Sequence, residues 1–314
     1  MSGQVLHVIQ KSSEAVTGIA VLNDQLYVSG TQQIAVYCPT TFQFQHNLTF
    51  RHACGHRGSH SHSQAYFTCK RCYGHRAVQQ LQSMVGCNVN NCLYASARRS
   101  SEICTVALGQ NNKWSSWSVR GTPRGLSVTS SHNLLVCTQV NYHGGCGAVV
   151  YDDFDSDDVD DDYDGDSCKQ SYCLHEYSTN GRVIRQISFQ PDVISKPVHA
   201  VQLANDQYGV THHGPTHQFS IVRADGQLVQ SYRGDAGNMN GPDGIAVDEQ
   251  GRVFVADQNS HRILVVDCKT LSAYPLQLSA DCKLNGPRSI HYDSTNSRLY
   301  IGESNGARVV CCKL

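Results

Sequence analysis

Short apolar runs separated by turn residues recur along the chain, and the clearest set lies in its C-terminal third. Residues 241–248, 251–257 and 259–267 form three β-rich runs about ten residues apart, broken by Gly, Asp and Asn. This spacing predicts an up-and-down antiparallel meander. A second set follows with a period near 44, and its runs are 286–293, 298–303 and 307–310.

Four weaker copies of the pattern precede these two. Their runs are 17–21, 25–29 and 34–37; 84–87, 92–96 and 103–106; 123–128, 134–137 and 174–177; and 197–201, 207–210 and 217–222. A fixed period of about 40–45 residues with about four strands per copy is typical of a β-propeller. The pattern therefore predicts an all-β, six-bladed β-propeller that covers residues 1–314 as one domain.

Closure of the ring explains an otherwise unmatched run at the N-terminus. The last copy has three runs and lacks a fourth, whereas residues 5–9 form a strand-like run that belongs to no copy. If the N-terminal strand completes the last blade, two exposed sheet edges disappear. We therefore expect an N-terminal strand that closes the last blade.

One triplet within the repeat carries a family resemblance. The sequence Asn259-Ser260-His261-Arg262-Ile263 resembles the Asn-His-Leu signature of the NHL repeat. The resemblance is close over 241–280, good over 286–312 and looser in the first four copies. It implies an NHL-type propeller similar to the C-terminal propeller of TRIM-NHL proteins, some of which bind single-stranded RNA on a basic face. Some NHL-like propellers are lyases that use a metal bound in the channel.

Two insertions interrupt the repeats, at 51–79 and at 138–173. The first follows the fourth strand of blade one, and the second separates the second and third strands of blade three. Because strand direction alternates within a blade, loops at these two positions emerge on the same face. We therefore expect two loop insertions on one face of the ring.

The first insertion is rich in metal-ligand residues. Cys69-Lys70-Arg71-Cys72 has the Cys-x-x-Cys spacing that lets two thiolates share one tetrahedral Zn²⁺. The candidate zinc ligands are Cys54, His56, Cys69, Cys72 and His75. The alternative is a solvated loop of biased composition without a metal.

The second insertion changes how the net charge of −1 is interpreted. Ten Asp residues lie between positions 151 and 167, and without them the chain would carry +9. Asp160, Asp162 and Asp164 are spaced like the first ligands of an EF-hand calcium loop, but Ser171 stands where a bidentate Glu belongs. A solvated acidic loop is the alternative to a calcium site.

The composition also indicates in which cellular compartment the protein is expected. Charged residues make up only 16% of the chain, and 15 residues are Cys. No apolar run approaches the roughly 18 residues that a membrane span needs, and the N-terminal segment lacks the pattern of a signal peptide. We expect a cytoplasmic protein without a membrane span, monomeric, with mostly free thiols.

Three functions are compatible with this sequence. A non-enzymatic scaffold that presents loops to a protein partner is the first expectation. Single-stranded RNA binding on a basic face is the alternative, and its candidate residues near the starts of inner strands are Arg120, Arg124, Arg233 and Arg288. A metal-dependent enzyme, a lyase or hydrolase, is the second alternative, and His199 and His291 are the histidines expected on inner strands.

No catalytic residue is assigned. The chain has no Gly-x-Ser-x-Gly elbow, phosphate-binding Gly loop or His-Glu-x-x-His motif. Asp257, His261 and Arg262 occupy repeat positions beside strands, where we expect polar side chains to tie neighbouring strands together.

Overall fold

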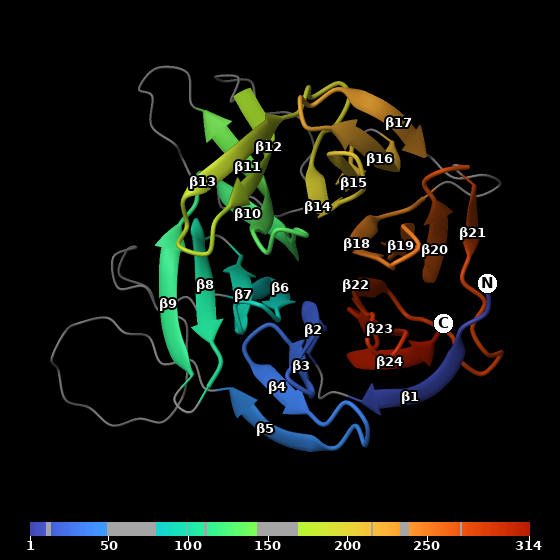
Figure 1. Cartoon of the computed structure of the whole chain (residues 1–314). Helices are drawn as coiled ribbons and strands as arrows, with labels where there is room; N and C mark the ends of the chain where they lie inside the picture. Colours follow the sequence, from blue (N-terminus) through green and yellow to red (C-terminus); the bar gives the residue numbers. More distant parts are fainter. Residues whose placement is uncertain are drawn as a thin grey trace, which may run out of the picture.

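A computed structural model describes residues 1–10, 14–48, 80–98, 100–109, 112–142, 169–214, 216–232, 239–270 and 272–314. Over these residues the regular elements are 24 β-strands and no helix. The strands form six four-stranded antiparallel sheets, which stand as blades around a central axis (Figure 1). The prediction of an all-β, six-bladed propeller is confirmed.

The blades follow one another in chain order. Blade 1 consists of β2 (Gly18–Leu22), β3 (Gln25–Ser29), β4 (Ile34–Tyr37) and β5 (Phe44–Leu48). Blade 2 consists of β6 (Leu81–Cys87), β7 (Cys92–Ala97), β8 (Glu102–Ala107) and β9 (Lys113–Ser118). Blade 3 consists of β10 (Thr122–Val128), β11 (Leu134–Tyr142), β12 (Lys169–Tyr177) and β13 (Val183–Ser188).

The remaining blades repeat this order. Blade 4 consists of β14 (Pro197–Gln202), β15 (Gln207–His213), β16 (His217–Arg223) and β17 (Leu228–Tyr232). Blade 5 consists of β18 (Pro242–Val247), β19 (Arg252–Asp257), β20 (Arg262–Asp267) and β21 (Ala273–Pro275). Blade 6 consists of β22 (Pro287–Asp293), β23 (Arg298–Glu303), β24 (Arg308–Lys313) and β1 (Gln4–Gln10).

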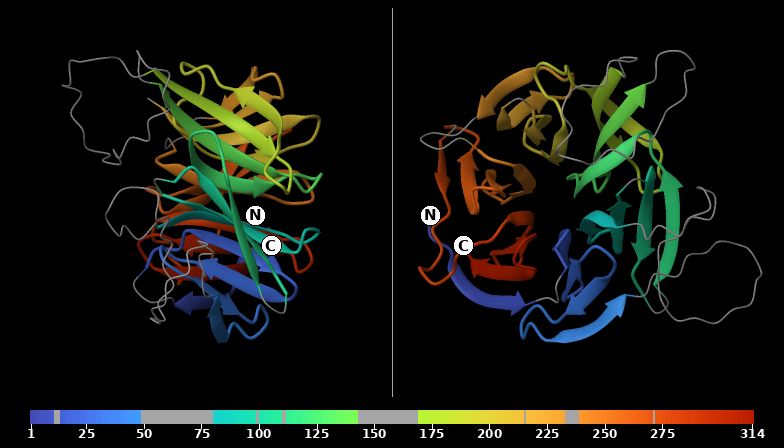
Figure 2. Two further views of the ribbon diagram at one scale, coloured as in Figure 1. Left: turned by 90° about the vertical axis from the view of Figure 1, so that its left-hand side faces the viewer. Right: turned by 180° about the vertical axis from the view of Figure 1, so that it is seen from behind.

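The N-terminal strand closes the ring as predicted. β1 pairs antiparallel with β24, from Gln4 opposite Lys313 to Gln10 opposite Arg308. The residues before β1 also reach blade 5, because the Gly3 N–H donates to the Gln277 carbonyl at 2.8 Å. The N-terminal segment thus joins the last two blades, and both termini lie beside each other (Figures 1 and 2).

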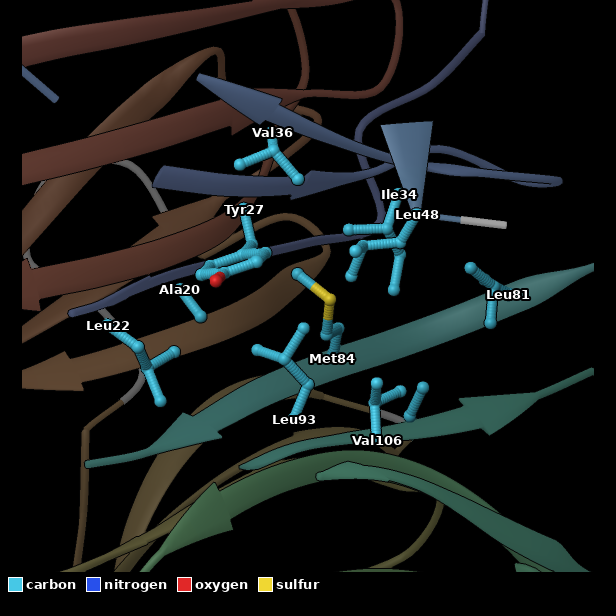
Figure 3. Close-up of a cluster of buried hydrophobic side chains, with 11 residues drawn as sticks. Ala20, Leu22, Tyr27, Ile34, Val36, Leu48, Leu81, Met84, Leu93 and Val106 are labelled. Atoms are coloured by element: carbon cyan, nitrogen blue, oxygen red, sulfur yellow. The ribbon is translucent and has the colours of Figure 1, made fainter. Parts of the chain in front are cut away.

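The hydrophobic core is divided among the junctions between blades. Each of six buried clusters draws its side chains from two consecutive blades. Figure 3 shows the cluster between blades 1 and 2, where Tyr27 and Val36 meet Met84 and Leu93. Both faces of a blade are buried, because successive residues of a strand point to opposite neighbours. The strands therefore read as continuous apolar runs instead of alternating ones.

Polar residues in and beside the NHL-like triplet connect parts of blade 5 and link this blade to blade 6. Asp257 is fully buried, and its carboxylate accepts from Arg262 Nε at 2.8 Å and from the Asn240 N–H at 2.7 Å. His261 Nδ1 accepts from the Gly286 N–H at 2.9 Å, at the entry to blade 6. These contacts support the expectation that Asp257, His261 and Arg262 tie strands together.

Blade 6 repeats the carboxylate arrangement. Glu303 is fully buried, and its carboxylate accepts from Arg308 Nε at 2.6 Å and from the Asn285 N–H at 2.9 Å. A buried carboxylate is tolerated when a cation and hydrogen-bond donors replace its lost hydration. The repeat therefore specifies an ion pair that orients the loop leading into each of the last two blades.

The insertion points lie on one face, as alternation of strand direction requires. Residues 51–79 connect the end of β5 to the start of β6 and lie outside the described residues. The predicted bounds 138–173 of the second insertion are too wide. β11 continues to Tyr142 and β12 begins at Lys169, because these two strands stay paired with each other beyond Gln139, where the pairing of β11 with β10 ends.

Two further expectations concern thiols and membranes. The described cysteines, at positions 38, 87, 92, 104, 137, 173, 268, 282, 311 and 312, are free thiols. Burial raises the pKa of most of these thiols, as for Cys268, whose pKa is raised to about 11. Among the described residues, no helix is long and apolar enough to cross a membrane.

Candidate functional site

A channel passes between the innermost strands of the six blades. Its cavity has a volume of about 820 Å³ and is lined by residues of β2, β6, β10, β14, β18 and β22. These inner strands approach closely, since a Cβ on Gly125 would overlap the Val198 carbonyl of the next blade. A cavity of this size falls within the range of about 300–1,000 Å³ that is usual for ligand sites.

One mouth of the channel is strongly cationic. Arg98 follows β7, Lys196 precedes β14, and Arg124 and Arg288 lie near the starts of β10 and β22. All four side chains line the cavity, and Asp243 is the one carboxylate among the described lining residues. Since first strands begin and second strands end on the same face, the four cations gather at one end of the channel, with a net charge of +3.

The two arginines at the mouth are held by their neighbours. Arg288 Nε lies 3.2 Å from Asp243 Oδ2 of the preceding blade. Arg124 Nη2 donates to Gln139 Oε1 at 3.1 Å, within its own blade. Both side chains are half-buried. The bond to Gln139 orients the Arg124 guanidinium at the mouth.

Farther into the channel, His199 acts as a bridge between blades. Its Nδ1 accepts from the Ile245 N–H at 3.2 Å, and its Nε2 therefore carries the proton and donates to the Leu126 carbonyl at 2.9 Å. Burial lowers the pKa of His199. The neutral ring thus connects the inner strands of blades 3 and 5 across blade 4.

His291 also bridges two blades, at the junction between blades 6 and 1 where the ring closes. Its Nε2 accepts from the Val21 N–H of blade 1 at 3.3 Å, and burial lowers its pKa to about 4. Hydroxyl groups also bind backbone groups of the next blade. Ser127 Oγ of blade 3, for example, donates to the Ala200 carbonyl of blade 4 at 2.5 Å. An innermost strand has a free edge. Histidine and serine side chains of neighbouring blades satisfy its backbone groups.

The structure brings together only some of the residues singled out in the sequence. Arg124 and Arg288 both line the cavity, and they belong to blades 3 and 6, which lie opposite each other in the ring (Figure 1). Arg120 is exposed in the loop between β9 and β10, on the same face but outside the lining of the cavity. Arg233 lies outside the described residues.

The candidate metal ligands all belong to the two insertions. Cys54, His56, Cys69, Cys72 and His75 lie in the segment 49–79, outside the described residues. Asp160, Asp162 and Asp164 lie in the segment 143–168, which is likewise outside them. Within the described part of the chain, no three His, Cys, Asp or Glu side chains are grouped so that they could hold a metal ion.

Sequence reasoning missed two of the four cations. Arg98 follows the second strand of blade 2, and Lys196 stands immediately before the repeat-starting Pro197. Both positions become neighbours of the channel only because second strands end where first strands begin. Superposing the six repeats by strand, and counting charges at these two strand ends, would have found them.

Six four-stranded blades around a channel define this chain as a six-bladed β-propeller. The family model of the NHL repeat matches residues 239–266, which contain β18 and β19 and most of β20 of blade 5. The chain is accordingly a six-bladed β-propeller that carries an NHL repeat in blade 5. Among curated proteins, none matches the sequence.

Solved structures share the architecture at low sequence identity. A protein of unknown function from Bacteroides caccae has a TM-score of 0.57 at 12% identity, over 88% of this chain and 81% of that chain. Streptogramin B lyase has a TM-score of 0.60 at 8% identity, over 98% and 97%. Virginiamycin B lyase from Staphylococcus aureus has a TM-score of 0.60 at 8% identity, over 98% of each chain. At these identities the likeness shows the fold alone.

Proposed function

We propose that the protein is a non-enzymatic binding scaffold, and that a protein partner docks on the face where the cationic mouth of the channel opens. The observation that carries this proposal is the charge at that mouth, with four cations and one carboxylate among the described lining residues. The strand ends from which both insertions start and to which they return also lie on this face. Function in propellers resides in such grafted loops.

The chemistry of the channel histidines supports a role other than catalysis. Both ring nitrogens of His199 are engaged with backbone groups, and His291 Nε2 accepts from the Val21 N–H. A general base or metal ligand needs a nitrogen lone pair that faces the reactant. The likeness to two lyases rests on fold at 8% identity, and the enzyme alternative draws no further support from it.

A pair of charge-reversal variants tests which face binds. Arg98→Glu with Arg120→Glu alters the mouth face, whereas Arg223→Glu with Lys269→Glu alters loops between third and fourth strands on the opposite face. Proteins cross-linked to each form in cells are compared with the wild type by quantitative mass spectrometry. We expect at least one protein to be lost from the first variant and kept by the second. Identical sets for both variants would contradict the proposal.

Single-stranded RNA is the second candidate, because Arg120, Arg124 and Arg288 share the cationic face. Binding through phosphates is strongly salt-dependent. The same cross-linking experiment with ribonuclease treatment separates the two readings. If RNA is the partner, RNA should be recovered with the cross-linked protein. Proteins that are captured only through that RNA should then be lost after ribonuclease treatment.

A further inference from the structure

We propose that Cys87 and Cys92 form an oxidisable dithiol site, which a small disulfide of the glutathione class converts into a cross-strand disulfide. The two residues close the β6–β7 hairpin of blade 2, where Cys87 stands directly opposite Cys92 in the antiparallel register. Both are free thiols in the structure. The site goes beyond the proposed scaffold function, because it lies at the face opposite the channel mouth and needs no partner.

The register places the two thiols within reach of each other. Residues directly opposite in an antiparallel pair have Cα atoms about 4.5–5.5 Å apart and side chains on the same face. A disulfide requires Cα atoms about 4.4–6.8 Å apart. Both cysteines belong to the buried cluster between blades 2 and 3, which also contains Leu126 and Leu134 of blade 3. The two thiols therefore point to the same side of blade 2.

The repeat does not require cysteines at these two positions. The pairs that close the same hairpin in the other five blades are Leu22–Gln25, Val128–Leu134, Gln202–Tyr208, Val247–Val253 and Asp293–Arg298. Among the described residues, Cys87 and Cys92 are the only two cysteines that stand opposite each other in a strand pair. The dithiol is thus a particular feature of blade 2.

The dithiol lies directly below an exposed turn. Residues 88–91 connect the two strands, and Val89 in this turn is 66% exposed, whereas Cys87 and Cys92 are 2% and 4% exposed. Oxidation therefore requires transient opening of the turn, and loops open at lower cost than core strands. Burial raises the pKa of Cys92, so its thiolate is scarce and the reaction is slow.

The reaction consists of two thiol–disulfide exchanges. One cysteine, as its thiolate, attacks the small disulfide, forms a mixed disulfide and releases one small thiolate. The second cysteine then attacks the protein sulfur of the mixed disulfide, forms the Cys87–Cys92 bond and releases the second small thiolate. Two electrons pass from the protein to the small disulfide, and the two protons of the protein thiols end on the two small thiols.

The disulfide would fix a turn that connects three blades. Asn91 Oδ1 accepts from Asn23 Nδ2 of blade 1 at 2.6 Å, and Asn90 Nδ2 donates to the His132 carbonyl of blade 3 at 3.0 Å. A cross-link at the base of this turn restricts the unfolded chain and also opposes local opening. We therefore expect oxidation to stabilise this part of the ring.

Peptide mapping in glutathione buffers tests the inference. The full-length protein is equilibrated with fixed reduced glutathione and increasing glutathione disulfide, in native buffer and unfolded in urea, and free thiols are then alkylated. Equilibrium is approached from the reduced and from the oxidised protein, so that slow access to the buried thiols does not affect the midpoint. Residues 77–98 form one tryptic peptide, whose cysteines are Cys87 and Cys92 alone. We expect its internal disulfide to form at a glutathione disulfide concentration at least about tenfold lower in the folded protein than in urea.

The chain supplies a matched control. Residues 309–313 form a tryptic peptide with Cys311 and Cys312, which are adjacent in sequence but belong to buried clusters on opposite faces of β24. This peptide should gain no internal disulfide in the folded protein. The variant Cys87→Val has the residue type that ends the first strand in blades 3 and 5. Oxidation should raise the melting temperature of the wild type by a few degrees and leave that of the variant unchanged.

Three results would overturn the site. The first is a midpoint that is equal or higher in native buffer than in urea. The second is a peptide 77–98 that carries glutathione in place of the internal bond. The third is equal oxidation of the peptides 77–98 and 309–313 in the folded protein, because the register would then not select the pair. None of these measurements involves a partner, so each result leaves the scaffold proposal to its own test.

Discussion

Acidification should weaken the junction that closes the ring, and His291 is the residue through which this can be measured. In the folded protein its Nε2 must stay unprotonated to accept the Val21 N–H at 3.3 Å. Protonation would remove this acceptor and place a charge in a poorly hydrated part of the channel. The replacement His291→Gln puts a neutral amide oxygen near the same place, and that group does not titrate between pH 4 and 7.

The expected magnitude follows from the pKa values of the two states. Burial lowers the pKa of His291 to about 4 in the folded protein, and the Asp293 carboxylate opposes this shift more weakly. In the unfolded chain the pKa is about 6.5. Between these values the unfolded chain binds a proton that the folded protein does not. The free energy of unfolding should therefore fall by about 1.4 kcal/mol per pH unit, or about 3 kcal/mol in total.

This value is an upper bound, because the His291 side chain is half-buried and keeps some access to the channel. Above about pH 6.5 both states are neutral, and the imidazole makes no proton-linked difference. Urea unfolding of the wild type and of His291→Gln at about pH 7, 6, 5 and 4.5 measures the effect. As the pH falls, the wild type should lose up to about 3 kcal/mol more than the variant.

The control is the same substitution at an exposed strand position. His46 lies in β5 with an exposed side chain, and His46→Gln should retain the pH dependence of the wild type. If the wild type and His291→Gln lose stability in parallel across the whole pH range, the reasoning from the Val21 contact is refuted. A parallel loss would mean that the imidazole is already hydrated in the folded protein.

Three further predictions test closure, the repeat ion pairs and the Cys/His-rich insertion. Deleting residues 2–10 should lower solubility or the melting temperature markedly, because β1 completes blade 6; an unchanged melting temperature would contradict the closure. Arg308→Met should reduce the free energy of unfolding in urea by about 3–5 kcal/mol, because it leaves the Glu303 carboxylate buried without its cation. If zinc is bound, Cys69→Ser with Cys72→Ser should remove about one equivalent of metal in elemental analysis while the propeller stays folded; wild-type protein without zinc would end that hypothesis.

The number of blades and the closing strand could be predicted from the sequence because both depend on local signals that repeat. A strand needs an apolar run of a few residues, and a turn needs Gly, Asp or Asn at defined places. The same pattern recurs six times, as at 241–267 and 286–310, so one weak copy is supported by the others. A blade buries its faces only against neighbouring blades. The leftover run at residues 5–9 therefore had to complete the last one.

The channel mouth was decided by the tertiary structure. Arg124 and Arg288 could be named as basic residues near inner strands, but nothing in their spacing shows that they line the same cavity. Arg98 and Lys196 join them because the ring brings the end of one blade's second strand beside the start of another blade's first strand. His199 likewise bonds to blades 3 and 5 at once. Such contacts depend on the angle between blades, which arises when six junction cores pack together, and no local pattern encodes that angle.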